Sequence, residues 1–222
     1  MSSRFDKNYT GQGYAMNYFR LPNVAHWKKM ALQFRIELED ITPAIWRVIQ
    51  VPADYNFWDL HVAIQDAMGW LNYHLHYFEI KPKHKRELRR IGIPDFEEPH
   101  ESFPIDPGWE IAIDSIFKDL GSSATYLYDF GDSWKHKVTL DGYMHKYKNQ
   151  SYPMCVNGRR ACPPEDCGGV PGYMHLLEVL GDKQNPEYNE MREWAGDYDP
   201  ETFNPEEVVF SDPQKRWRKA FF

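Results

Sequence analysis

Hydrophobic and polar residues alternate in the segment that follows the first 29 residues of the chain. The apolar positions of this segment are Leu32, Phe34, Ile36 and Leu38. Alternation with a period of two is typical of a strand that buries one face. The stretch before it shows no sustained period. We therefore predict a loose N-terminal extension over 1–29 and one folded domain over 30–222.

The next segments predict a hairpin and then a helix. Thr42-Pro43 is typical of a turn, and the apolar residues of 45–51 then form a returning strand. Over 57–68 the apolar residues recur at helical spacing instead. Asn56 and Asp59 have the spacing of a capping box, and a glycine follows the last apolar position. The sequence therefore predicts a strand, a turn, a second strand and a helix, in this order.

The central part of the chain predicts further strands around one long loop. Residues 74–81 form a strand, whereas 82–108 are charged and proline-rich, as is typical of a long loop. A short helix is expected over 114–120. From 125 to 140 the pattern is strand, turn, strand, and Gly131-Asp132 at its centre favours a type II′ hairpin turn.

Helices dominate the C-terminal third. Four helix starts have a proline in the first turn, at Pro171, Pro186, Pro205 and Pro213. Proline suits this position because its missing N–H would have no partner there anyway. Strands first and helices last predict an α+β fold. We expect a mixed, largely antiparallel sheet, built from the N-terminal and central hairpins, packed against helices that are concentrated at the C-terminus.

The charge balance argues against general binding to a phosphate backbone. The chain has 26 basic and 33 acidic residues, a formal charge of −7, whereas nucleic-acid binders need a basic face. The basic segment over 215–219 leaves docking to nucleic acid open but not favoured. No apolar run approaches the roughly 20 residues that cross a bilayer, and three cysteines are too few for a secreted disulfide framework. We therefore expect a cytoplasmic protein without a membrane partner.

The segment "RRACPPEDCGG" over 159–169 admits two interpretations. Its thiols, together with Cys155, could hold a metal ion, but Cys155, Cys162 and Cys167 lack the CxxC spacing that structural zinc sites use. Alternatively, small cysteines pack beneath a corner that two consecutive prolines stiffen. The spacing favours the rigid corner, from which Glu165 and Asp166 would project.

Two further groups of residues could carry chemistry. His74 and His76, two apart on the expected strand, would leave the same face and could ligate a metal, or could simply form a polar strand face. Asp129 could face His136 across the central hairpin and orient its imidazole. In the structural alternative, Asp132 only shapes the turn and His136 lies on a solvated face.

Four blocks of the chain resemble one known family. They are "PAIWRVIQVP", "AMGWLNYHLHYFEI", "YDFGDSWKHKV" and "GRRACPPEDCGGVPGY". From about Leu32 to Val209 the chain is similar to the Ri-plasmid (pRiA-type) open-reading-frame-three-like family, also known as insertion-element passenger or resolvase-like proteins. The resemblance implies an α+β domain of plasmids and mobile elements without an established activity. It implies no recombinase, because no nucleophile of that kind can be assembled from Ser133 or the tyrosines.

The resemblance also marks a set of polar positions that a compact fold could bring together. They are Trp46, His74, His76, Asp129, Gly131, Asp132, Trp134, His136, Glu165 and Asp166. A mutually bonded structural network is the competing explanation, because buried polar groups are nearly always satisfied by partners.

Three functions are compatible with these residues, and the sequence favours the first, with the other two as alternatives. The first is a module that binds an unknown protein or small molecule in a groove of Trp46, Trp134, Arg159, Arg160 and Tyr173. The second is a metal-dependent hydrolase or nuclease. Its expected metal ligands are His74, His76, Asp129 and His136, with Asp129, Asp132, His136, Glu165 and Asp166 as candidate catalytic residues. The third is a nucleic-acid-processing partner of a mobile element. A divalent metal is the cofactor that these residues could hold.

Overall fold

The computed structural model describes residues 28–81, 88–94 and 104–221. Within these ranges, eight strands form one sheet in the order β5-β4-β3-β6-β7-β1-β2-β8. Their bounds are β1 (Met30–Leu38), β2 (Trp46–Pro52), β3 (His76–Ile80), β4 (Arg89–Gly92), β5 (Ile105–Pro107), β6 (Ser123–Tyr128), β7 (Trp134–His145) and β8 (Met154–Arg159). Neighbouring strands are antiparallel except β4 and β5. The sheet is therefore mixed and largely antiparallel, as expected.

The first strand shows how the alternating pattern becomes a core. Phe34 and Ile36 are fully buried, whereas Gln33, Arg35 and Glu37 between and beside them are partly exposed. β1 lies between β2 and β7, so it is one of the central strands. Apart from Lys28 and Lys29, the predicted extension over 1–29 lies outside the described residues.

Four α-helices accompany the sheet: α1 (Phe57–Met68), α2 (Gly169–Gly181), α3 (Tyr188–Ala195) and α4 (Pro213–Phe221). The predicted capping box of α1 is present, with the side chain of Asn56 accepting from the N–H of Asp59 and the Asp59 carboxylate accepting from the N–H of Asn56. The helix ends at Gly69, whose φ of 94° is left-handed. This confirms the predicted start and end of the helix.

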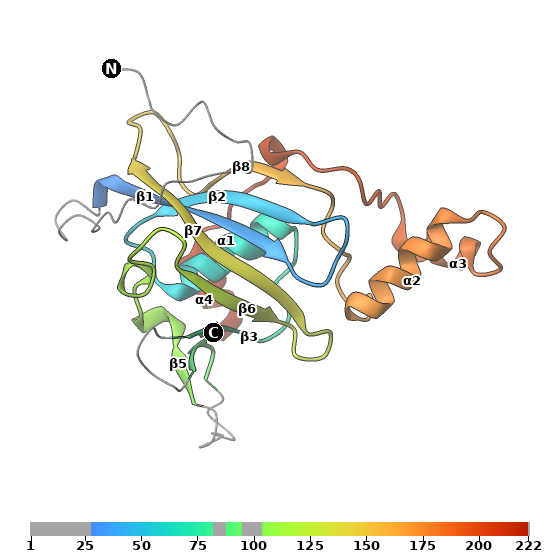
Figure 1. The fold of residues 1–222 in the computed structure, drawn as a ribbon, viewed down its shortest axis with the longest axis horizontal. Helices are drawn as coiled ribbons and strands as arrows, with labels where there is room; N and C mark the ends of the chain where they lie inside the picture. The colour runs from blue at the N-terminus through green and yellow to red at the C-terminus, as the bar shows by residue number, and fades with distance from the viewer. Residues whose placement is uncertain (1–27, 82–87, 95–103, 222) are drawn as a thin grey trace.

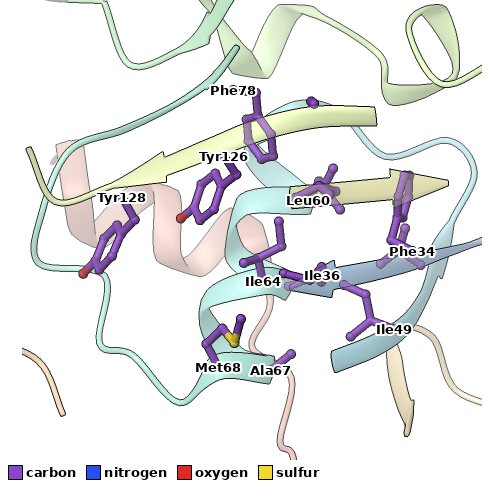
Figure 2. Close-up of a cluster of buried hydrophobic side chains, with 14 of the residues drawn as sticks. Phe34, Ile36, Ile49, Leu60, Ile64, Ala67, Met68, Phe78, Tyr126 and Tyr128 are labelled. Atoms are coloured by element: carbon purple, nitrogen blue, oxygen red, sulfur yellow. The ribbon is translucent and has the colours of Figure 1, made fainter. Parts of the chain in front are cut away.

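α1 covers one face of the sheet and is itself covered by α4. Leu60 and Ile64 of α1 lie with Phe34 and Ile36 of β1 in the buried cluster (Figure 2). On the other side of α1, the indole of Trp58 packs edge-on against Trp217 of α4, with ring centroids 5.1 Å apart. α1 is therefore buried on two sides. No described helix is both long and apolar enough to span a bilayer.

Two expectations for the central part of the chain were wrong. The long loop predicted over 82–108 contains β4 and β5 in its described parts. The helix predicted over 114–120 is reduced to a 3-10 turn, η3 (Ile113–Ser115). Its continuation is replaced by a bend that places Phe117 in the core, edge-on to Phe34 at 4.8 Å. Burial of one large ring outweighs the local helix preference there.

The hairpin between β6 and β7 does not contain a type II′ turn at Gly131-Asp132. Its positive φ angles lie at Asp129 (56°) and Ser133 (57°), not at Gly131. The Oδ1 atom of Asp129 accepts from the N–H groups of Gly131 and Asp132, at 2.9 and 3.3 Å. An aspartate that bonds to its own following backbone sets the shape of this turn.

The C-terminal helices occur close to where they were expected, with two differences. α3 begins at Tyr188 and its N-cap is Glu187, so Pro186 precedes the helix and does not lie in its first turn. The helix predicted after Asn204-Pro205 is only a 3-10 turn, η4 (Pro205–Glu207), although the Asn204 side chain caps it as predicted. α2 and α3 extend together beyond the end of the sheet where the β6–β7 hairpin turns (Figure 1). The α+β class with C-terminal helices is therefore confirmed.

Candidate functional site

Three loops meet where the β6–β7 hairpin approaches the start of α2. They are the loop after α1 (70–75), the hairpin turn (129–133) and the Cys/Pro corner (160–168). Glu165 of the corner joins the other two: Oε1 accepts from the Tyr128 hydroxyl at 2.6 Å, and Oε2 accepts from the N–H of Leu71 at 2.9 Å. Asp132 of the hairpin accepts from the N–H of Gly168 at 3.1 Å. These bonds fix the three loops to one another.

One side chain from each loop points to a common centre. The ligand atoms of His74, Asp129 and Asp166 all lie within 4.8 Å of one another. The Nε2 atom of His74 lies 3.2 Å from Asp166 Oδ1 and 3.6 Å from Asp129 Oδ2. Two ligands of one metal ion, each with a bond of about 2.0–2.2 Å, lie roughly 3–4 Å apart. The two distances match that arrangement.

The electrostatic setting of this group differs from that of an ordinary surface ion pair. The His74 Nε2 atom is buried and makes no hydrogen bond, although both carboxylates lie within 3.6 Å of it. Asp129 is 8% exposed; its Oδ1 is occupied by the hairpin backbone, which leaves Oδ2 facing His74. The Asp166 side chain is 71% exposed, so the group is open to solvent on one side. Both aspartates have left-handed φ, 56° and 58°.

His76 does not belong to this group. β3 begins at His76, so His74 lies in the preceding loop and the two side chains do not share a strand face. The imidazole of His76 is buried and stacked on that of His61, with ring centroids 3.4 Å apart and an interplanar angle of 4°. Burial lowers the pKa of His76 well below its ordinary value, and burial lowers that of His61 to about 3.

His136 is also a core residue and does not face Asp129. It is opposite Tyr126 on β6 and Leu38 on β1, and its ring lies edge-on to Trp70 at 5.2 Å. Burial lowers the pKa of His136 to about 3. Neither the predicted Asp129–His136 pair nor its alternative, a solvated histidine, is present.

The residues expected to form an aromatic groove do not form one. Trp134 (1% exposed) and Tyr173 (0%) are in the core, and the Tyr173 hydroxyl is 3.3 Å from that of Tyr198. Trp46 lies on β2 beneath the guanidinium of Arg35, 4.2 Å from its ring centroid. The sequence pattern did not show that the Trp134 side chain points into the core.

The two arginines of the corner are directed away from its acids. Arg159 is exposed on β8, opposite Trp46. Arg160 is 3% exposed and donates to Glu201 at 2.8 Å and to the carbonyl of Pro43 at 2.9 Å. It holds the loop after α3 against the β1–β2 turn instead of holding Glu165 or Asp166.

The cysteines fit the interpretation of a rigid corner. All three thiols are free, and Cys155 and Cys162 are buried. Burial raises the pKa of the Cys162 thiol, and burial raises that of Cys167 to about 12. The indole N–H of Trp70 donates to the carbonyl of Pro163 at 3.0 Å. Among the described residues, the group of three close metal-ligand atoms contains no cysteine.

Large exposed apolar side chains lie next to His74 and Asp129 along the chain, and sequence reasoning did not identify them. Leu71 (58% exposed), Tyr73 (68%) and Leu75 (49%) flank His74, and Phe130 (44%) follows Asp129. The signal was present in "GWLNYHL", where apolar residues continue after the glycine that ends α1. The proximity of Asp166 to His74 and Asp129 was missed as well, because Asp166 lies far from both in sequence.

The basic C-terminal helix, which was expected as a docking segment for nucleic acid, already uses part of its surface to contact α1. Arg216 of α4 forms an ion pair with Asp66 of α1, and Trp217 packs on Trp58. Lys215, Arg218 and Lys219 remain exposed.

Comparison with known proteins assigns most of the described chain to one family. Residues 30–207 match the family described as plasmid pRiA4b ORF-3-like protein. The chain is 32% identical over 195 residues to the uncharacterized protein y4hQ of Sinorhizobium fredii, an alignment that covers 85% of this chain and 95% of that protein. The crystal structure of protein of unknown function MM3350 from Methanosarcina mazei Go1 has a TM-score of 0.74 at 40% identity, covering 82% of this chain and 98% of that one. None of these descriptions supports the insertion-element or resolvase-like label.

Proposed function

We propose a function for this chain, which belongs to the plasmid pRiA4b ORF-3-like family. In this proposal His74, Asp129 and Asp166 bind one divalent cation, and the protein is a metal-dependent hydrolase. The observation that carries the proposal is the Nε2 atom of His74. It is buried, lacks a hydrogen bond and lies between two carboxylates on separate loops. A buried polar atom without a hydrogen bond is costly, and a cation at this centre would give that atom a ligand bond and neutralise both aspartates.

The donor set suits catalysis better than a purely structural role. Three protein ligands leave at least one coordination position for water, as in catalytic metal sites, whereas structural sites are closed by four. One imidazole and two carboxylates suit Zn²⁺, Mn²⁺ or Mg²⁺, and not a soft ion that prefers thiolates. The exposed side of Asp166 would let a substrate reach the open position.

A bound cation would lower the pKa of its water and polarise the bond to be cleaved. In hydrolysis the water oxygen adds to the electrophilic carbon or phosphorus, and the water's two protons end on the leaving group and in solvent. Glu165 is an unsuitable general base because both of its oxygens already accept hydrogen bonds from Tyr128 and Leu71. We assign it the role of positioning the corner that carries Asp166.

The nuclease variant is less well supported. The formal charge is −7, and the neighbours of the centre include the further acids Asp132 and Glu165. A polyanionic backbone would have to approach an acidic surface, which costs electrostatic free energy. We therefore favour a neutral or cationic substrate.

A binding module without catalysis is the second candidate. The exposed side chains of Leu71, Tyr73, Leu75 and Phe130 lie on the same two loops as His74 and Asp129. Several large apolar side chains exposed on adjoining loops are typical of an interaction site. In this case, the metal would hold the loops in position for a partner.

Calorimetric titration of the metal-free chain with Zn²⁺ or Mn²⁺ tests the site. We expect one equivalent to bind, and His74→Gln or Asp166→Asn to weaken binding by at least about tenfold. Asp197→Asn, which changes an exposed carboxylate after α3, is the matched control. Binding that is absent, or equal in all these variants, would refute the site.

Turnover separates the two candidates. The metal-loaded chain would be assayed against activated esters, anilides and phosphodiesters, with His74→Gln as the inactive reference. Hydrolysis that requires both the metal and His74 supports the hydrolase. Tight metal binding without turnover of any of the three classes would favour the binding module.

A further inference from the structure

A second feature adjoins the proposed metal centre: a cavity of about 340 Å³ between α2 and α3. Its apolar lining includes Leu176, Met191 and Trp194, and its acidic lining consists of Asp166, Glu187 and Glu190. Neither α2 nor α3 carried a site residue in the sequence interpretation apart from Tyr173, which is buried. The cavity therefore needs an explanation of its own.

The helical register explains why these side chains gather. Four lining residues follow one another at spacings of three and four, so they share one face of α3. They are the N-cap Glu187 and the helix residues Glu190, Met191 and Trp194. On α2, Gly172, His175 and Leu176 follow the same spacing. The face that α3 presents to α2 is thus acidic at one end and aromatic at the other.

The charge of the cavity is one-sided. None of the residues that line it is a lysine or an arginine, and its histidine, His175, already lies 3.1 Å from Glu187 Oε2. A concave surface with charges of one sign concentrates the field inside it and attracts ions of the opposite sign. Trp194 is 51% exposed and offers an aromatic face of the kind that binds ammonium and guanidinium groups.

We infer that this pocket recognises an organic cation, a protonated amine or guanidinium on an apolar stem such as an arginine or lysine side chain. Glu190 and Glu187 would pair with the charge, and Trp194 with Met191 would cover the stem. The volume is at the small end of the roughly 300–1,000 Å³ of ligand pockets, which suits one side chain and not a large ligand. The negative net charge of the chain favours the same partner.

The position of Asp166 relates the pocket to catalysis, a step that rests on the proposed function. Asp166 lines the pocket and also belongs to the His74–Asp129–Asp166 group. A ligand whose cationic end occupies the pocket therefore has its other end beside the metal centre. The substrate class that follows is an amide or ester next to a basic side chain.

Two small ligands of nearly identical shape test the pocket directly. N-acetyl-arginine amide carries the guanidinium, and N-acetyl-citrulline amide replaces it with a neutral urea. Each would be titrated into the full chain in the presence of a chelator and followed by the indole N–H signal of Trp194, assigned with Trp194→Phe. We expect the arginine compound to bind at least about tenfold more tightly and its binding to weaken with added salt.

Matched variants on α3 locate the contact. Glu190→Gln should remove most of the preference for the arginine compound, whereas Glu193→Gln, which changes an exposed acid of the same helix outside the pocket, should leave it unchanged. Equal binding of both compounds, or equal effects of both variants, would overturn the inference.

The result is independent of the proposed metal centre, because the chelator removes the metal. If the metal titration succeeds and the arginine compound fails to bind, the pocket inference is wrong and the metal site stands. If the arginine compound binds and the metal does not, the pocket stands as a binding site and the hydrolase proposal falls.

Discussion

The hydroxyl of Tyr128 donates a 2.6 Å hydrogen bond to Glu165 and thereby joins the end of β6 to the Cys/Pro corner. Burial, and then the neighbouring Glu165, raise the pKa of Tyr128, so it remains a protonated donor at all ordinary pH values. The same carboxylate also receives the N–H of Leu71. One acid therefore positions the two loops that carry His74 and Asp166.

Replacing Tyr128 with phenylalanine should loosen this junction. The variant keeps the ring but leaves Glu165 without its strongest donor, so we expect the free energy of unfolding to fall by about 1–2 kcal/mol. Urea denaturation checks the value. Tyr147→Phe, at an exposed tyrosine, should change stability by less than about 0.5 kcal/mol. Equal effects would mean that the bond contributes nothing.

Replacing Trp134 with alanine should destabilise the fold and not merely weaken a ligand. The indole is 1% exposed and packs near Trp70, with ring centroids 5.8 Å apart. Removing a buried aromatic ring costs about 3–5 kcal/mol. Trp46→Ala, at a half-buried ring that stacks under Arg35, should cost only about 1 kcal/mol. A Trp134→Ala protein as stable as the wild type in urea would contradict the burial of this ring.

Elements with a strong local signal were predictable from the sequence. β1 follows from strict alternation, and α1 follows from its capping box and terminal glycine. In both, local preference and burial agree. They disagree at Phe117, where burial of the ring ends the helix early, and at Asp129, whose side chain decides the turn.

The sequence indicated which types of residue form the candidate site, but not which individual residues lie together. Histidine and acids were singled out, yet His76 differs from His74 by only two positions and lies in the core. The strand boundary that separates them depends on pairing with β6 and β4, which no local pattern contains. Asp166 joins the group only because Glu165 and Asp132 hold the corner against the hairpin.

Acid should unfold the protein through its buried histidines. Burial lowers the pKa of His61 and of His136 to about 3, whereas in the unfolded chain both have a pKa of about 6.5. Between these values the unfolded state binds more protons, so stability is complete above about pH 6.5 and falls as pH decreases toward 3. Each histidine contributes a slope of up to about 1.4 kcal/mol per pH unit.

The variant His136→Leu isolates one of these contributions. It replaces the imidazole with an apolar side chain that has no proton to gain, so its free energy of unfolding should fall less steeply between about pH 6 and pH 4. Urea denaturation at a series of pH values measures the slope. A slope equal to that of the wild type would show that His136 does not titrate on unfolding.

Gly169 should be intolerant of any side chain because it lies where α2 begins against the hairpin. Its φ is +67°, and an added Cβ would lie 2.5 Å from the carbonyl oxygen of Asp132. We expect Gly169→Ala to lower the free energy of unfolding by roughly 1–3 kcal/mol, because left-handed backbone is strained for alanine and the hairpin must also move. Gly181→Ala, at the other end of α2 with nothing within 4 Å of the added atom, should be neutral or stabilising by up to about 1 kcal/mol. Metal titration of both variants adds a second measurement, since displacement of the hairpin moves Asp129 away from Asp166. We expect Gly169→Ala to bind metal more weakly and Gly181→Ala to bind it as the wild type does. If Gly169→Ala is destabilised but keeps its metal affinity, the contact between α2 and the hairpin does not position the metal site.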